Sequence, residues 1–101
     1  MAGFNVSVPH ALGQQAAQER VAQFLDGVRQ KYANDISNVR GDWNDNRLQF
    51  GFTAVGMPIS GTLVVEEQQV QVSGPLPLMA MMFRGKVEQT IRSELERLLI
   101  G

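Results

Sequence analysis

Between residues 48 and 74, apolar residues alternate with small or polar ones at a period of two. This alternation is typical of β-strands with one buried face. It predicts strands over 48–54, 59–66 and 70–74, separated by short turns at Gly56-Met57-Pro58 and Glu67-Gln68. The inward residues are Leu48, Phe50, Phe52, Ala54, Ile59, Gly61, Leu63, Val65, Val70 and Val72. Short turns join antiparallel strands, so we expect an antiparallel sheet covered on one face only.

Two further strands are predicted outside this block. Phe4, Val6 and Val8 alternate with polar neighbours and indicate a strand over 4–8, which Pro9 ends. Residues 36–43 indicate another strand, followed by a turn at Asn44-Asp45-Asn46.

Helical periodicity marks two other segments. Over residues 12–32 the apolar stripe consists of Ala17, Val21, Phe24, Leu25, Val28 and Tyr32. Over residues 78–100 it consists of Phe83, Val87, Ile91, Leu95 and Leu98, beside an expected i,i+4 ladder of Arg84, Glu88, Arg92 and Glu96. The predicted fold is a single α+β domain over 1–101: a two-layer sandwich of order β-α-β-β-β-β-α, with both helices packed on one face of an antiparallel sheet.

Composition narrows the range of functions. Nine Lys and Arg against ten Asp and Glu give a net charge of −1, which argues against nucleic-acid binding. There are no cysteines, so disulfides and thiolate chemistry are excluded. The first twelve residues do not resemble a signal peptide, and the longest apolar run, Pro75–Phe83, is too short to span a bilayer. We therefore expect a cytoplasmic bacterial protein without a transmembrane segment.

The chain offers little for catalysis or metal binding. His10 is the only histidine, and its place before a helix suits capping or packing. Asp42, Asn44 and Asp45 fit a β-turn better than a calcium loop. We therefore predict no catalytic residue, no metal site and no cofactor, and we expect a protein that is not an enzyme. An enzyme acting on hydroxyacyl compounds with His10 as its base is the disfavoured alternative.

Residues 75–83 are unusually rich in apolar side chains. Met82 and Ile100 fall off the helical stripe and Met81 lies at its edge, so burying all of them against one sheet is difficult. Methionine-rich surfaces adapt to irregular apolar partners. We therefore assign a candidate interaction surface to Leu78, Met79, Met81, Met82 and Ile100. The alternative is that the proline-rich lead-in folds over the open end of the core.

Two other regions are candidate binding surfaces. A pocket between sheet and helices, lined by Phe24, Trp43, Phe50 and Phe52, would suit a small molecule. The far face of the sheet carries small or polar uncharged residues and is either solvated or the interface of a homodimer.

Several segments resemble one bacterial family. They are His10-Ala11-Leu12-Gly13, Trp43 with Leu48-x-Phe50, and Phe83-Arg84-Gly85-Lys86-Val87 followed by Ile91 and Leu95-Glu96-Arg97-Leu98-Leu99. In these the chain is similar, from Phe4 to Leu99, to the polyhydroxyalkanoic acid system proteins, also called the polyhydroxyalkanoate granule-region family. The resemblance implies a link to polyester storage but no reaction, so it carries over no catalytic residue.

The expected function is thus that of a non-enzymatic accessory protein of polyhydroxyalkanoate storage. Its expected partner is the granule surface or a granule protein. The alternative function is a module that binds a hydroxyacyl or lipid-like small molecule between the sheet and the helices.

Overall fold

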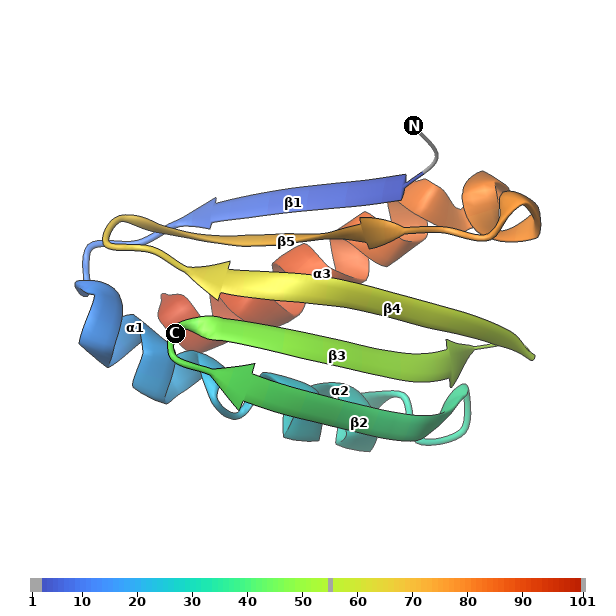
Figure 1. The fold of residues 1–101 in the computed structure, drawn as a ribbon, viewed down its shortest axis with the longest axis horizontal. Coiled ribbons are helices and arrows are strands. Elements are labelled where there is room, and N and C mark those ends of the chain that lie inside the picture. Colours follow the sequence, from blue (N-terminus) through green and yellow to red (C-terminus); the bar gives the residue numbers. More distant parts are fainter. Residues whose placement is uncertain (1–2, 55, 101) are drawn as a thin grey trace.

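Five strands form one antiparallel sheet in the computed structural model, which describes residues 3–54 and 56–100. The strands are β1 (Gly3–Pro9), β2 (Ile36–Asn44), β3 (Arg47–Ala54), β4 (Met57–Val65) and β5 (Gln69–Pro75). Their order across the sheet is β1-β5-β4-β3-β2, so β2 to β5 form a meander and the last strand pairs with the first (Figure 1). The predicted α+β sandwich with an antiparallel sheet is confirmed.

The register explains why one face of the sheet is apolar. Residues opposite each other on antiparallel strands point to the same face. Leu48 lies opposite Leu63 across β3 and β4, and Leu63 lies opposite Val72 across β4 and β5. All three side chains are fully buried. The period of two in the sequence therefore becomes one continuous apolar surface.

The helical segment predicted over 12–32 is two helices, α1 (Gln14–Val21) and α2 (Phe24–Lys31). The first begins after Gly13, whose φ of 83° favours glycine. At Gln23 the backbone leaves the helical region, with φ −91° and ψ 4°, and its amide bonds the Arg20 carbonyl instead of continuing the α-helical ladder. The apolar stripe continues across this break, since Val21 and Phe24 are both buried.

The segment predicted as a helix over 78–100 also has two parts. The first six residues form a 3₁₀ turn, η1 (Leu78–Phe83), and the α-helix proper is α3 (Arg84–Leu99). The turn begins after Pro77, which is extended, with φ −56° and ψ 148°. A 3₁₀ turn has three residues per turn, so side chains three apart lie above one another.

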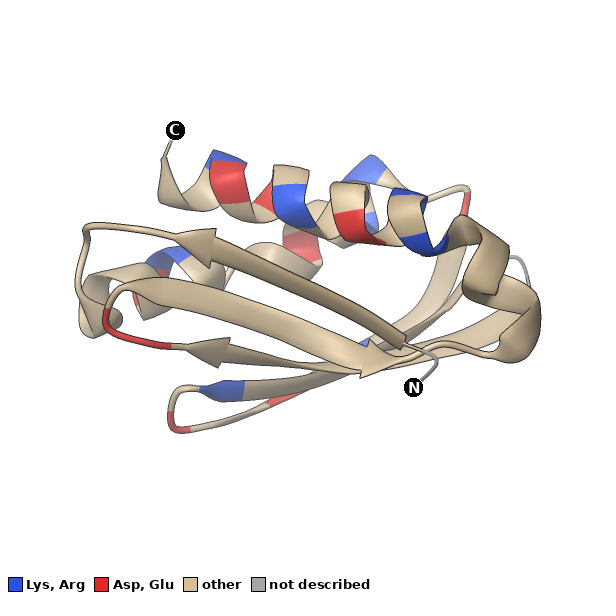
Figure 2. Ribbon diagram, turned by 90° about the horizontal axis from the view of Figure 1, so that it is seen from above, with Lys and Arg blue, Asp and Glu red and all other residues tan. Residues whose placement is uncertain are grey.

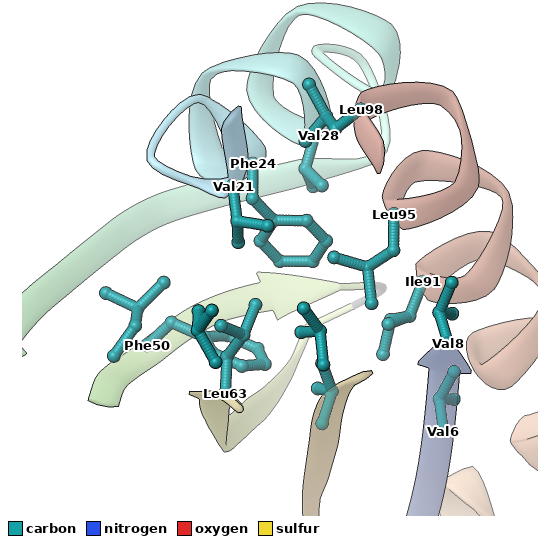
Figure 3. Close-up of a cluster of buried hydrophobic side chains, with 14 of the residues drawn as sticks. Val6, Val8, Val21, Phe24, Val28, Phe50, Leu63, Ile91, Leu95 and Leu98 are labelled. Atoms are coloured by element: carbon teal, nitrogen blue, oxygen red, sulfur yellow. The ribbon is translucent and has the colours of Figure 1, made fainter. Parts of the chain in front are cut away.

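All three α-helices cover the same face of the sheet (Figures 1 and 2). Helix α3 packs along β1, whereas α2 packs against β2. Between the layers lies one core, in which Phe24 and Val28 of α2 meet Leu95 of α3 above Leu63 (Figure 3). Burying each such side chain contributes about 1.5–3 kcal/mol before conformational entropy is subtracted.

Helix α3 also covers the outer edge of β1. The Asn5 amide donates to a carboxylate oxygen of Glu88 at 2.9 Å, and Arg92 donates to the Ser7 carbonyl at 3.1 Å. The charge ladder expected on α3 is thus only partly formed. Arg84 and Glu88 pair at 3.4 Å, while Arg92 bonds the strand.

Candidate functional site

One end of the sandwich is closed by polar contacts around His10. The Leu12 amide donates to His10 Nδ1 at 3.2 Å, and Nε2 lies 3.0 Å from the Glu66 carbonyl oxygen. Because Nδ1 accepts a hydrogen bond, the neutral ring carries its proton on Nε2 and donates it to Glu66. The Nε2 contact therefore joins the β1–α1 connection to the β4–β5 turn, while the Nδ1 contact holds the ring within the β1–α1 connection.

Amide side chains complete this polar end. The Val65 carbonyl accepts from Gln14 at 3.0 Å and from Asn46 at 2.8 Å. Gln18 of α1 donates to the Asp45 carbonyl in the β2–β3 turn. Helix and turns are thereby joined, and the core is shielded from solvent at this end.

The opposite end presents exposed apolar side chains on η1. Four of them form what we call the η1 patch: Leu78, Met79, Met82 and Phe83, which are 85 %, 79 %, 80 % and 47 % exposed. In a 3₁₀ turn Met79 and Met82 lie one above the other, as do Ala80 and Phe83. Ala80 is buried, so the turn rests on Ala80 and presents both methionines to solvent.

The other two residues assigned to this surface lie elsewhere. Met81 is half-buried and packs against the core. Ile100 is 71 % exposed, but it follows the 16 residues of α3, a helix about 24 Å long. The candidate interaction surface therefore contains Leu78, Met79 and Met82, gains Phe83, and does not extend to Ile100.

Positive charge borders the η1 patch. Arg84 and Lys86 open α3 directly after the turn, and both are exposed. Figure 2 shows η1 without charged residues and blue bands at the start of α3. Arg84 pairs with Glu88 at 3.4 Å, whereas no carboxylate of residues 3–54 and 56–100 lies within ion-pair distance of Lys86.

A cavity of about 340 Å³ opens beside this patch, between the ends of the sheet and the helices. We call it the end cavity. Aromatic rings form part of its wall: Phe50 meets Phe24 edge-on at 6.0 Å and stacks on Phe52 at 6.4 Å. The lining residues are Phe24, Leu25, Val28, Tyr32, Asp35, Ile36, Phe50, Phe52, Ala54, Met57, Ile59, Ala80, Phe83, Lys86, Val87, Thr90 and Ile91.

Three of the four residues expected to line a pocket meet here: Phe24, Phe50 and Phe52. Trp43 is not among the lining residues, since it lies opposite Leu48 near the polar end of β2. Sequence reasoning missed the residues at element ends, such as Tyr32 at the end of α2 and Ile36 at the start of β2. The antiparallel register was the available signal, because it brings Ile36 opposite Ala54 at one end of the sheet.

The far face of the sheet is shallowly hollowed. A depression of about 530 Å³ is lined in part by Arg40, Asp42, Gln49, Ser60 and Thr62. Arg40 and Asp42 of β2 add charge to a face that was expected to be uncharged. A homodimer through this face stays a prediction.

One charged side chain lies inside the helical layer. The Glu94 carboxylate is buried and pairs with Arg97 at 2.5 Å. The side-chain hydrogen bond to Glu94, together with its negative charge, raises the pKa of the Arg97 guanidinium above its ordinary value. Glu94 also lies against Gly27 of α2, where a Cβ would overlap its carboxylate. This pair therefore serves the contact between α2 and α3.

A family model described as "putative polyhydroxyalkanoic acid system protein" matches residues 4–99. The chain belongs to this family. The residues matched by the family model include the η1 patch and the lining of the end cavity, and they stop before Ile100. The family description links the protein to a polyhydroxyalkanoate system. Among curated proteins and among solved structures, no match was found.

Two further observations concern a membrane-spanning helix and a metal site. No helix in the described part of this polyhydroxyalkanoic acid system protein is long and apolar enough to cross a membrane. Residues 3–54 and 56–100 contain no group of three His, Cys, Asp or Glu side chains placed to hold a metal ion.

Proposed function

We propose that this protein is a non-enzymatic accessory protein of polyhydroxyalkanoate storage that acts in the bacterial cytoplasm and binds the granule surface through the η1 patch. The exposure of four large apolar side chains within one six-residue turn carries the proposal. The family membership supplies the context. Exposed apolar clusters on otherwise polar proteins mark sites of contact with other surfaces.

The chemistry of the patch fits an apolar surface with anionic groups. Methionine side chains are flexible and polarisable, so Met79 and Met82 can follow an irregular surface. Arg84 and Lys86 stand next to them, and a cation near an anionic interface contributes about 1 kcal/mol. Apolar insertion with flanking cations is how peripheral proteins bind such interfaces.

The environment of His10 supports a role without catalysis. Its two ring nitrogens contact the Leu12 amide and the Glu66 carbonyl. A general base needs a nitrogen free to accept a substrate proton. Using His10 in that way would break one of the contacts that close the polar end.

Co-sedimentation with purified polyester granules tests the proposal. We expect Met79→Lys/Met82→Lys to reduce granule binding at least tenfold, because burying a methionine contributes about 1.5–3 kcal/mol and a lysine removes that gain. The matched control is Ala22→Lys/Ile100→Lys, which adds the same charge at exposed positions away from η1. This control should bind like the wild type.

Two outcomes would contradict the proposal. Equal binding by the Met79→Lys/Met82→Lys variant and the wild type would show that the η1 patch does not bind the granule. Binding to native granules but not to granules stripped of protein would assign the contact to a granule protein instead of the surface.

A further inference from the structure

The end cavity has the walls of a site for an aliphatic chain. The floor of the cavity is formed by the buried side chains of Val28, Ile59 and Ile91. Part of its wall is formed by the half-buried side chains of Phe52 and Val87. Its volume lies within the range of small-molecule sites, roughly 300–1,000 Å³. At roughly 30 Å³ per methylene, about the share of one water molecule in the liquid, a cavity of about 340 Å³ has room for roughly ten chain carbons.

The charged residues at the mouth of the end cavity indicate which head group a ligand would carry. Lys86 comes from α3 and Asp35 from the connection between α2 and β2, and both are exposed at the rim. Within the described residues no carboxylate pairs with the Lys86 ammonium. A ligand carboxylate beside Lys86 would find a cation there and stay in contact with water, so neither charge needs to be desolvated.

We propose that the end cavity binds a single unbranched aliphatic carboxylic acid, with its chain between α2, α3 and the β3–β4 end of the sheet and its carboxylate beside Lys86. This site goes beyond granule binding, which uses the exposed methionines of η1, although Phe83 and Lys86 border both sites. The cavity holds an aliphatic chain in its apolar interior, and Lys86 selects a carboxylate over an alcohol or an ester.

Titration calorimetry with hexanoate, octanoate, decanoate and dodecanoate, below their micelle concentrations, tests the chain site. The affinity should rise about fourfold for each methylene, from about 0.8 kcal/mol each. The rise should stop near ten carbons, where the cavity is full. An affinity that keeps rising through dodecanoate would indicate adsorption on an open surface and overturn the proposal.

Variants locate the chain. Ala54→Leu and Thr90→Leu place extra carbon in the cavity from the sheet and from α3. Both should lower decanoate affinity at least tenfold while the melting temperature is kept or raised, which separates blocked binding from unfolding. Unchanged affinity in both folded variants would overturn the proposal.

Charge variants locate the carboxylate. Lys86→Gln should weaken decanoate binding several-fold and leave decanol binding unchanged, whereas Asp35→Asn should strengthen decanoate binding by removing a like charge. The control is Lys31→Gln, because Lys31 is the other lysine of the chain and does not line the cavity. Equal effects of Lys86→Gln on decanoate and decanol would overturn the assignment of the head group.

Two readouts separate this site from its alternatives. The Met79→Lys/Met82→Lys variant should keep decanoate binding even when granule binding is lost, so each proposal can fail alone. A side chain from a second copy of the protein is the other possible occupant of the cavity. If light scattering shows that decanoate only dissociates a dimer, and this dissociation accounts for all the heat in calorimetry, the proposal is wrong.

Discussion

One row across the apolar face of the sheet consists of glycine and phenylalanine residues. Gly41 lies opposite Phe50, Phe50 opposite Gly61, and Gly74 opposite Phe4. A Cβ on Gly61 would lie 2.8 Å from Phe50 Cζ, 2.9 Å from the Ser73 carbonyl oxygen and 3.0 Å from Phe4 Cζ. Both rings therefore lie over the glycine backbone and fill the space that a side chain would occupy.

Gly61→Ala should destabilise the protein by about 1–3 kcal/mol, the usual cost of adding carbon to a filled core. The Ser73 carbonyl belongs to the backbone and cannot turn away as a side chain would. Gly85→Ala is the matched control, because nothing lies within 4 Å of a Cβ there. It should leave stability unchanged or raise it by up to about 1 kcal/mol. Denaturant unfolding measures both, and equal stabilities would contradict the packing account.

For single residues, the sequence predicts burial better than it predicts the role of each residue in the structure. Leu48, Phe50, Leu63 and Val72 are buried as predicted, because alternation is a local property of each strand. The role of Gly61 depends on two rings from other strands and appears only when the register is known. Glu94 was not expected in the core, since its burial depends on a gap left by Gly27 of another helix.

At the scale of elements, the sheet protects its two edges in different ways. The outer backbone of β1 is occupied by Glu88 and Arg92 of α3. Edge strand β2 instead carries a bulge, with a register shift between Ser37 and Arg40 and a φ of 56° at Asn38. Unprotected edges recruit further strands, and both covered backbone and bulges prevent this.

Glu88→Ala/Arg92→Ala should therefore do more than remove two surface charges. We expect a loss of about 1–2 kcal/mol, from two hydrogen bonds of about 1 kcal/mol each. The uncovered edge should also increase self-association measured by light scattering. Gln89→Ala/Glu96→Ala, at two exposed positions of the same helix, is the control and should change neither quantity. Similar behaviour of the two double variants would show that α3 does not protect the edge.

Element types were predictable and helix interruptions were not. The stripe of Val21, Phe24 and Val28 runs through the break between α1 and α2, so hydrophobic periodicity carries no sign of it. Likewise, positions three apart share a side in a 3₁₀ turn and nearly so in an α-helix. The periodicity therefore did not distinguish η1 from the start of α3.

At the scale of the whole molecule, the two ends of the sandwich are built differently. Side-chain hydrogen bonds from His10, Gln14 and Asn46 close one end. The other end keeps an apolar cavity of about 340 Å³ beside exposed methionines. An unfilled apolar space lacks the contacts that a packed core would gain there. The molecule therefore forgoes some stability at the end where both proposed binding sites lie.

Filling the end cavity should recover that stability. Ala54→Leu adds apolar carbon to the lining, and cavity filling commonly stabilises a protein by about 0.5–2 kcal/mol. Ala16→Leu, at an exposed position of α1, controls for the added side chain and should stay within about 0.5 kcal/mol of the wild type. Thermal unfolding measures both. A destabilised Ala54→Leu variant would mean that this space is too small for the added carbon.

The pairing of the first strand with the last has a consequence for biosynthesis. Val8 meets Val70, and Phe4 meets Gly74, so β1 finds its neighbour only after most of the chain has been made. Contacts so distant in sequence require closure of a long loop, which slows folding. On the ribosome, the apolar side of β1 thus has no strand partner until β5 has left the exit tunnel, and during that interval it is open to chaperones and to aggregation.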